Sequence, residues 1–224
     1  MHDTFDRFNS RHCADTETLY QQGAPHPWVY WIEKGFVSIS ISDADGRQSI
    51  TDLLGAGDFF GPGLFGNEQR SRIPSADQHP NTYTAKQTAI AKPLTDTRII
   101  PAEEFWRLTD QTPSISLALT QQMIVIQQRL QHQLFLQQTG TLEQRLAYLL
   151  HNLFDRLGLE CTHGHLVDIR FSQQELASMV GGSRQTVSQI LADWRRSGVI
   201  DYTRSYICLE EPQRLQQFAE LSAG

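Results

Sequence analysis

The chain has 224 residues, of which 39% are hydrophobic and 20% are charged, as in folded globular proteins. Its 25 acidic and 19 basic residues give a net charge of −6, which excludes a uniformly basic surface but not a local basic patch, because salt confines the influence of a charge to about 8–10 Å. No apolar run approaches the roughly 20 residues of a membrane span, and the first residues lack the apolar core of a secretion signal, so we expect a cytoplasmic protein with no membrane partner.

The segment 19–60 shows the alternation of β-strands. Val37, Ile39 and Ile41 fall on one face of a predicted strand and serines fall on the other, so this strand should be buried on one face only. Asp45-Gly46 follows and predicts a two-residue hairpin turn in which both residues have positive φ. Glycines recur here about every ten residues, which predicts a small antiparallel barrel or roll.

Residues 61–82 are rich in Gly, Pro, Asn and Ser and predict a long loop, after which 83–100 return to short β segments. Pro101 and the acidic residues after it predict the start of a helix. We therefore expect a first domain, 1–112, that is a β-roll with a sensor or effector role.

Residues 113–138 show the longest helical pattern, about 40 Å at 1.5 Å per residue. Such a helix could be a core helix of one domain or a dimerisation helix. The narrow, long apolar seam favours a homodimer interface along 113–139. The seam is formed by Leu119, Met123, Ile126, Leu130 and Leu134. Gly140 ends the helix, 141–158 predict another amphipathic helix, and the last domain is expected to span 140–224.

Residues 172–196 predict two short helices joined by a tight turn. Ser172 and Glu175 form a capping box, and Gly181-Gly182 permits the turn. Ser183 caps the second helix, and Gly198 ends it. Four apolar residues at i, i+3, i+4 and i+7 pin the second helix to its domain, namely Val187, Ile190, Leu191 and Trp194.

The outward face of this second helix carries side chains that can read DNA. Arg184 can form two hydrogen bonds to guanine, and Gln185 or Gln189 can do the same with adenine; Ser188 completes the predicted base-contact set. Predicted phosphate contacts are Ser172, Ser183, Thr186 and Arg204. Two short strands flank Arg204 and predict a hairpin wing. The alternative is a three-helix packing unit with a polar outer face.

The chain resembles the Crp/Fnr transcription regulators over nearly its whole length. The likeness rests on Val29-Tyr30-Trp31-Ile32-Glu33-Lys34-Gly35 and Leu54-Gly55-Ala56-Gly57-Asp58-Phe59-Phe60-Gly61 in the first half, and on Ser183-Arg184-Gln185-Thr186-Val187-Ser188 in the second. It implies an α+β fold with an N-terminal antiparallel β-roll like that of cyclic-nucleotide-binding proteins, a long dimerisation helix and a C-terminal winged helix–turn–helix. It also implies a homodimer on a palindromic operator, with recognition helices about 34 Å apart.

By this resemblance Arg184, Gln185 and Gln189 match base-reading positions, and Ser183 and Thr186 match phosphate contacts. The cyclic-AMP-responsive members have Glu and Arg where this chain has Gln185 and Gln189, so we predict a different operator, with a guanine read by Arg184 and an adenine-leaning preference beside it.

The sequence does not identify the effector, and three candidate ligands or cofactors are not expected. Cyclic AMP is disfavoured because Gly61-Pro62-Gly63-Leu64 lacks the Glu that holds the ribose, and Arg70 and Arg72 are interpreted as solvated loop residues. An iron–sulfur cluster is disfavoured because only Cys13 is N-terminal. Haem through His26 or His79, a metal held by Cys161, His163 and His165, and a 2-oxoglutarate grip involving Arg129 have little support. The three cysteines are expected to be reduced thiols.

The sequence thus predicts a sequence-specific DNA-binding transcription regulator, with RNA polymerase as a further partner if it is an activator. It is not expected to be an enzyme, because it has no Ser-His-Asp arrangement or phosphate loop. The alternative is a small-molecule-sensing module with little or no DNA binding.

Overall fold

The computed structural model describes residues 2–65, 83–157, 159–161, 164–167, 171–202 and 207–219. They form two compact units, Met1–Ile126 and Gln127–Gly224. The division falls within the long helix, which had been expected to be a segment of its own. No helix of the described residues is long and apolar enough to cross a membrane.

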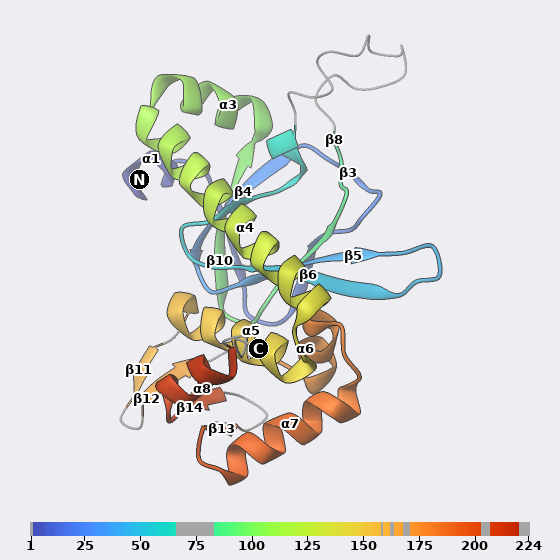
Figure 1. Ribbon diagram of the computed structural model, residues 1–224. Coiled ribbons are helices and arrows are strands. Elements are labelled where there is room, and N and C mark those ends of the chain that lie inside the picture. The colour runs from blue at the N-terminus through green and yellow to red at the C-terminus, as the bar shows by residue number, and fades with distance from the viewer. Residues whose placement is uncertain are drawn as a thin grey trace. The chain divides into compact units, whose positions relative to one another are not determined.

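The first unit is a roll of short antiparallel strands, as predicted (Figure 1). Two four-stranded sheets have the orders β1-β10-β4-β7 and β2-β9-β5-β6, and β3 pairs with β8. The strands are β1 (Asn9–Cys13), β2 (Glu17–Tyr20), β3 (Pro25–His26), β4 (Trp28–Lys34), β5 (Val37–Ser42), β6 (Gln48–Leu54), β7 (Phe59–Phe60), β8 (Tyr83–Thr84), β9 (Thr88–Ala91) and β10 (Thr95–Pro101). A short helix, α1 (His2–Phe5), precedes them.

Strand β5 differs from its prediction in two respects. Its serine face is also buried, since Ser38 and Ser40 are only 3% and 2% exposed, and Ile41 at the strand end is 41% exposed. The Ser38 hydroxyl donates to the carbonyl of Ile90, which satisfies one of these polar groups inside the roll. The Gln48 side chain of β6 donates to the Ser40 hydroxyl at 2.6 Å, so the serine face is covered as well, and the expectation of a strand buried on one face only was wrong.

The hairpin between β5 and β6 forms where Asp45-Gly46 predicted it, but its turn is wider than two residues. Asp43 accepts hydrogen bonds from the backbone N–H groups of Asp45 and Arg47 through its carboxylate. Gly46 has a φ of 78°, whereas Asp45 is not among the residues with positive φ. The side chain of Asp43 therefore organises the turn, and only Gly46 needs the left-handed conformation.

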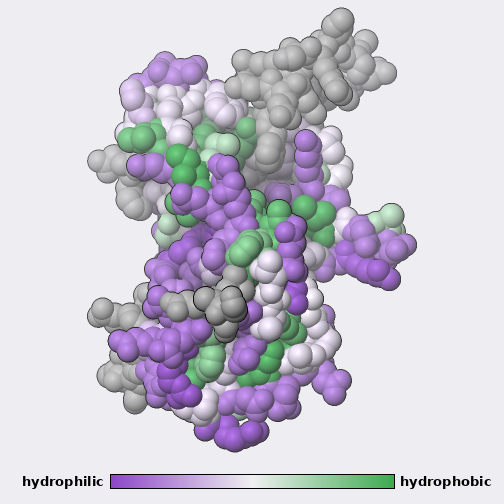
Figure 2. Space-filling view, viewed as in Figure 1, coloured by the Kyte–Doolittle hydropathy of each residue, from purple (hydrophilic) through white to green (hydrophobic). Residues whose placement is uncertain are grey.

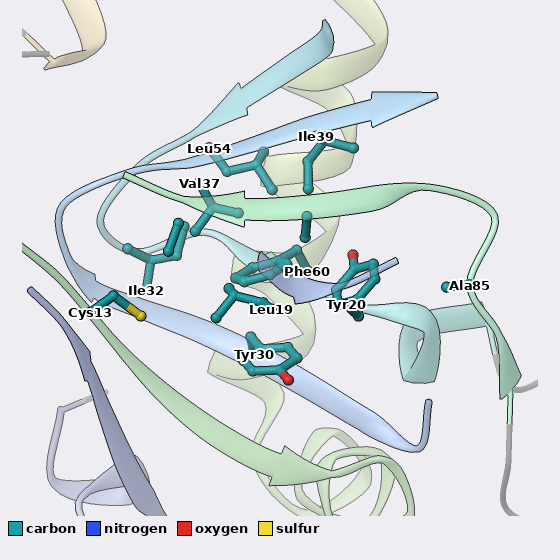
Figure 3. Packing of buried hydrophobic residues seen from close by; sticks show 12 residues of the cluster. Cys13, Leu19, Tyr20, Tyr30, Ile32, Val37, Ile39, Leu54, Phe60 and Ala85 are labelled. Atoms are coloured by element: carbon teal, nitrogen blue, oxygen red, sulfur yellow. The ribbon is translucent and has the colours of Figure 1, made fainter. Parts of the chain in front are cut away.

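The interior of the roll is filled by aromatic and aliphatic side chains (Figure 3). Tyr30 stacks on Phe60 with ring centroids 4.9 Å apart, and Tyr20 lies 6.2 Å from Tyr30. A second cluster around Phe5, Trp31 and Phe105 packs on the other side of β4 residues. Together these clusters fix the strands that carry the glycine-rich turns.

The first unit also contains the 3₁₀ helix η1, helix α3 and the first part of helix α4. A 3₁₀ helix, η1, spans Pro62–Phe65 in what had been predicted to be loop, and residues 66–82 lie outside the described part. Helix α3 spans Ala102–Gln111, and α4 spans Pro113–Thr139 as its periodicity predicted. Within the first unit, the Gln122 carboxamide accepts from the N–H of Phe59 and donates to its carbonyl, at 2.8 and 2.7 Å, which fastens α4 to β7.

In the second unit, the last part of α4 is followed by four further helices and a small sheet (Figure 1). Its elements are α5 (Leu142–Leu157), β11 (Leu159–Cys161), β12 (Gly164–Val167), α6 (Gln173–Val180), α7 (Arg184–Arg196), β13 (Ile200–Tyr202), β14 (Ile207–Leu209) and α8 (Pro212–Ala219). The sheet has the order β11-β12-β14-β13. The hairpin wing of β13 and β14 was predicted; β11, β12 and α8 were not.

Candidate nucleic-acid interface

Helix α6 begins and ends as its sequence predicts. The Ser172 hydroxyl accepts from the N–H of Glu175, and the Glu175 carboxylate accepts from the N–H of Ser172, which is the reciprocal pattern of a capping box. Gly181 ends the helix with a φ of 63°. At Gly182 an added Cβ would lie 2.5 Å from the side chain of Leu142, so this turn packs closely on α5.

Helix α7 is held by one apolar face. Val187, Leu191 and Trp194 are at most 2% exposed, and Ile190 is half-buried. The indole N–H of Trp194 donates to the Glu143 carboxylate on α5 at 3.0 Å, and its ring stacks on Phe218 of α8. The predicted stripe is therefore confirmed as the face that packs inward, and the orientation of α7 within the unit is fixed.

The opposite face of α7 presents Arg184, Gln185 and Gln189 to solvent, while Ser188 is half-buried. Within the described part of the chain, Arg184 forms no ion pair. It borders a hollow of about 830 Å³ whose lining includes Gln173 of α6 and Tyr202 of the wing. Sequence reasoning missed these last two residues, because Gln173 on α6 and Tyr202 on β13 come to line the same hollow only in the tertiary fold.

The hydroxyl groups of the predicted phosphate-contact residues already take part in different intramolecular hydrogen bonds. Ser172 donates to the Glu175 carboxylate at 2.9 Å, so a phosphate contact by its hydroxyl would require that hydrogen bond to break. Ser183 accepts from the N–H of Thr186, and the two hydroxyls share a hydrogen bond of 2.8 Å. Because that bond uses one of their two protons, the pair retains one hydroxyl proton for an outside acceptor. Arg204 lies outside the described residues.

The two arginines at the end of α7 are engaged with acidic residues. Arg195 pairs with Asp201 of β13 at 2.9 Å and lies over the ring of Tyr202. Arg196 pairs with Asp193 at 3.0 Å. The positive charges of Arg195 and Arg196 are thus largely neutralised, and Arg184 at the other end of the helix is better placed to meet a nucleic acid.

Of the suggested metal-binding group, Cys161 lies in strand β11 and His165 in strand β12. Cys161 pairs with Gly164 and Glu160 pairs with His165 between β11 and β12. His163 lies outside the described residues. Within the described residues, no group of three or more His, Cys, Asp or Glu side chains could hold a metal ion.

In the first unit, His26 and Tyr30 form a hydrogen-bonded aromatic stack. His26 and Tyr30 share a hydrogen bond of 2.9 Å and their rings are stacked. Burial raises the pKa of Tyr30 to about 12, and burial lowers the pKa of His26, with a further contribution from Arg11. The segment Gly61-Pro62-Gly63-Leu64, which contains no Glu, includes the buried Pro62. Arg70, Arg72 and His79 lie outside the described residues.

Two residues of the predicted apolar seam of α4 pack against the roll of the same chain. Leu119 and Ile126 are half-buried against the two core clusters of the roll. Met123, Leu130 and Leu134 are 63%, 47% and 61% exposed. Figure 2 shows hydrophobic surface interspersed with hydrophilic surface on the face viewed, where Figure 1 places α4.

Comparisons with known proteins agree with this architecture. Residues 144–218 match the family model of the Crp-like helix–turn–helix domain, and residues 10–77 match that of the cyclic nucleotide-binding domain. The cAMP-activated global transcriptional regulator CRP of Salmonella typhimurium is 31% identical over 179 residues, covering 78% of this chain and 76% of that protein. The global nitrogen regulator of Synechocystis is 25% identical over 217 residues, covering 96% and 87%.

The fold is also found in a solved structure, that of FixK2 from Bradyrhizobium japonicum. It has a TM-score of 0.74 at 19% identity and covers 96% of this chain and 99% of that one. A β-roll of the cyclic nucleotide-binding type followed by a winged helix–turn–helix defines a DNA-binding transcription regulator. The chain belongs to the Crp/Fnr family of transcription regulators.

Proposed function

We propose that this regulator binds a palindromic operator as a homodimer and that the first turns of α7 read its bases. Regulators of this family act on DNA as dimers. The observation that carries the proposal is the contrast between the two faces of α7. Val187, Leu191 and Trp194 are buried, whereas Arg184 and Gln185 are exposed at the start of the helix. Arginine in a major groove can form two hydrogen bonds with guanine.

The phosphate contacts proposed here centre on the start of α7. One hydroxyl proton of the Ser183 and Thr186 pair and the first N–H groups of the helix point to the same end, where the helix dipole is positive. Ser172 is a weaker candidate because its proton is donated to Glu175. Such contacts fix the register of a protein on the duplex without reading its sequence.

Binding-site selection with the full chain, followed by gel shifts at several salt concentrations, tests this function. Arg184→Ala should relax one base position and weaken specific binding by about 1–3 kcal/mol. Arg196→Ala removes the same charge from the far end of α7 and should leave every base preference in place. If selection returns no preferred sequence, or if the two variants lose affinity equally on all sequences, the chain is not a sequence-reading regulator and the sensing-module alternative is favoured.

The Salmonella relative is described by its name as cAMP-activated. We propose that cyclic AMP is not the effector of the sensor roll of this chain. The segment Gly61-Pro62-Gly63-Leu64 lacks the Glu that, by the family resemblance, would hold the ribose. A ligand present at a hundredfold excess over its Kd stabilises a protein by about 2.7 kcal/mol. Cyclic AMP should therefore leave the melting temperature unchanged, and a dose-dependent rise would overturn the proposal. If the regulator is an activator, RNA polymerase is its further partner.

A further inference from the structure

The side chain of Gln189 is tied to a neighbour on its own helix. Its Nε2 lies 3.1 and 3.2 Å from the two carboxylate oxygens of Asp193, one helical turn further on. Asp193 is in turn held by the ion pair with Arg196 at 3.0 Å. Because an ionised carboxylate only accepts hydrogen bonds, the group of Gln189 that faces it must be the NH₂ group. The contact with Asp193 therefore determines the orientation of the Gln189 carboxamide, whose Oε1 is directed away from Asp193.

This orientation restricts what Gln189 can offer to DNA. A freely rotating carboxamide can present either its donor or its acceptor to a base edge. With Nε2 facing Asp193, the acceptor Oε1 is the atom most available to a partner outside the helix. The negative charge of Asp193 acts in the same sense, because it attracts base donors and repels base acceptors. In the major groove, adenine N6 and cytosine N4 are donors, whereas guanine O6 and N7 and thymine O4 are acceptors.

We propose that Asp193 is a positioning residue for base reading: it holds Gln189 as a hydrogen-bond acceptor, so that this position of the operator favours adenine or cytosine on the contacted strand. The inference rests on the proposed function, since it assumes that Gln189 meets a base. It narrows that function by excluding guanine and thymine at the position. A pair of this kind on an isolated helix would otherwise be only a local contact that stabilises the helix slightly.

The experiment compares four operators that differ at the base pair read by Gln189. That base pair is located by binding-site selection with Gln189→Ala, as the position whose preference is lost. Affinities of the full chain are then measured by fluorescence anisotropy at one salt concentration. A single net hydrogen bond corresponds to a preference of about three- to tenfold for adenine or cytosine over guanine or thymine. Asp193→Ala should reduce this preference to less than about twofold by the same reasoning.

Two further variants separate orientation from charge. Arg196→Ala breaks the ion pair to Asp193 but leaves the contact with Gln189, so the preference should remain. The double variant Asp193→Ala, Gln189→Glu carries an acceptor that needs no orienting partner, and Glu accepts from cytosine N4, so the preference should return. Asp193→Ala also removes a negative charge that repels the DNA phosphates, which should raise affinity for all four operators by a similar factor. The loss of base preference is therefore read from the ratios between operators and not from the absolute affinities.

The result that overturns the inference is distinct from a failure of the proposed function. If the chain selects an operator but Asp193→Ala keeps the wild-type preference, or if the wild type favours guanine or thymine at this position, Asp193 does not orient Gln189 for reading. If the chain selects no operator at all, the proposed function itself is wrong, and the inference falls with it.

Discussion

Removing Leu134 from α4 should weaken the proposed dimer without unfolding either unit. Met123, Leu130 and Leu134 are spaced by seven and four residues, which places them on one face of the helix. Leu134 remains 61% exposed. Full burial of a leucine side chain stabilises by about 1.5–3 kcal/mol, so burying the exposed part contributes about 1–2 kcal/mol. A two-fold symmetric interface contains the residue twice, which doubles this to about 2–4 kcal/mol.

Leu134→Ala should therefore raise the dimer Kd by about thirtyfold or more, since each 1.4 kcal/mol is a factor of ten. Sedimentation equilibrium over a range of concentrations measures this directly. Phe135→Ala is the matched control, because Phe135 is 47% exposed but lies about 100° further round the helix. The argument is refuted if the wild type is monomeric at all concentrations, or if Phe135→Ala weakens association as much as Leu134→Ala does.

The remaining predictions concern the sensor roll. Gly61→Ala should lower the melting temperature by about 3–10 °C, because Gly61 has a φ of 122° and an added Cβ would lie 2.6 Å from the carbonyl oxygen of Trp28; unchanged melting would contradict this. Because the pKa of His26 is lowered in the folded chain, the unfolded chain binds a proton at higher pH than the folded chain does. Wild-type stability should therefore fall as pH decreases below about 6.5. Thermal melts should show a weaker dependence of stability on pH for His26→Gln than for the wild type. Burial raises the pKa of Cys13 from 9.0 to about 11, so alkylation of Cys13, followed by mass spectrometry, should be about a hundredfold slower in the folded chain than in urea, and equal rates would refute it.

Local signals in the sequence predicted the elements that carry the interface. The capping box at Ser172, the cap at Ser183 and the left-handed Gly198 after α7 are confirmed, because each depends on residues no more than three or four positions apart. The long helix α4 was predicted for the same reason, since its periodicity is intrinsic to the segment. The packing face of α7 followed from its apolar spacing alone.

Features that depend on distant parts of the chain were not predictable in this way. The burial of Ser38 and Ser40 involves contacts with Ile90 of β9 and Gln48 of β6, and the pairing of Arg195 with Asp201 requires the wing to return beside α7. The seam of α4 could be found from spacing, but spacing does not show that Leu119 and Ile126 pack on the roll of the same chain. Ion pairs between distant residues and burial are decided by the tertiary fold, so the sequence does not show that Arg195 is paired with Asp201.

The acidic residues around α7 resolve the apparent conflict between a net charge of −6 and DNA binding. Asp193 and Asp201 neutralise the arginines at the end of the helix, and Arg184 at its start forms no ion pair within the described residues. Few cations then remain to release counterions from phosphates, which weakens binding to arbitrary sequences, because that binding is almost wholly electrostatic. Hydrogen bonds to base edges do not depend on net charge, so they are retained. Under the proposed function, base reading by Arg184 and by the oriented Gln189 therefore gains discrimination from a low non-specific affinity.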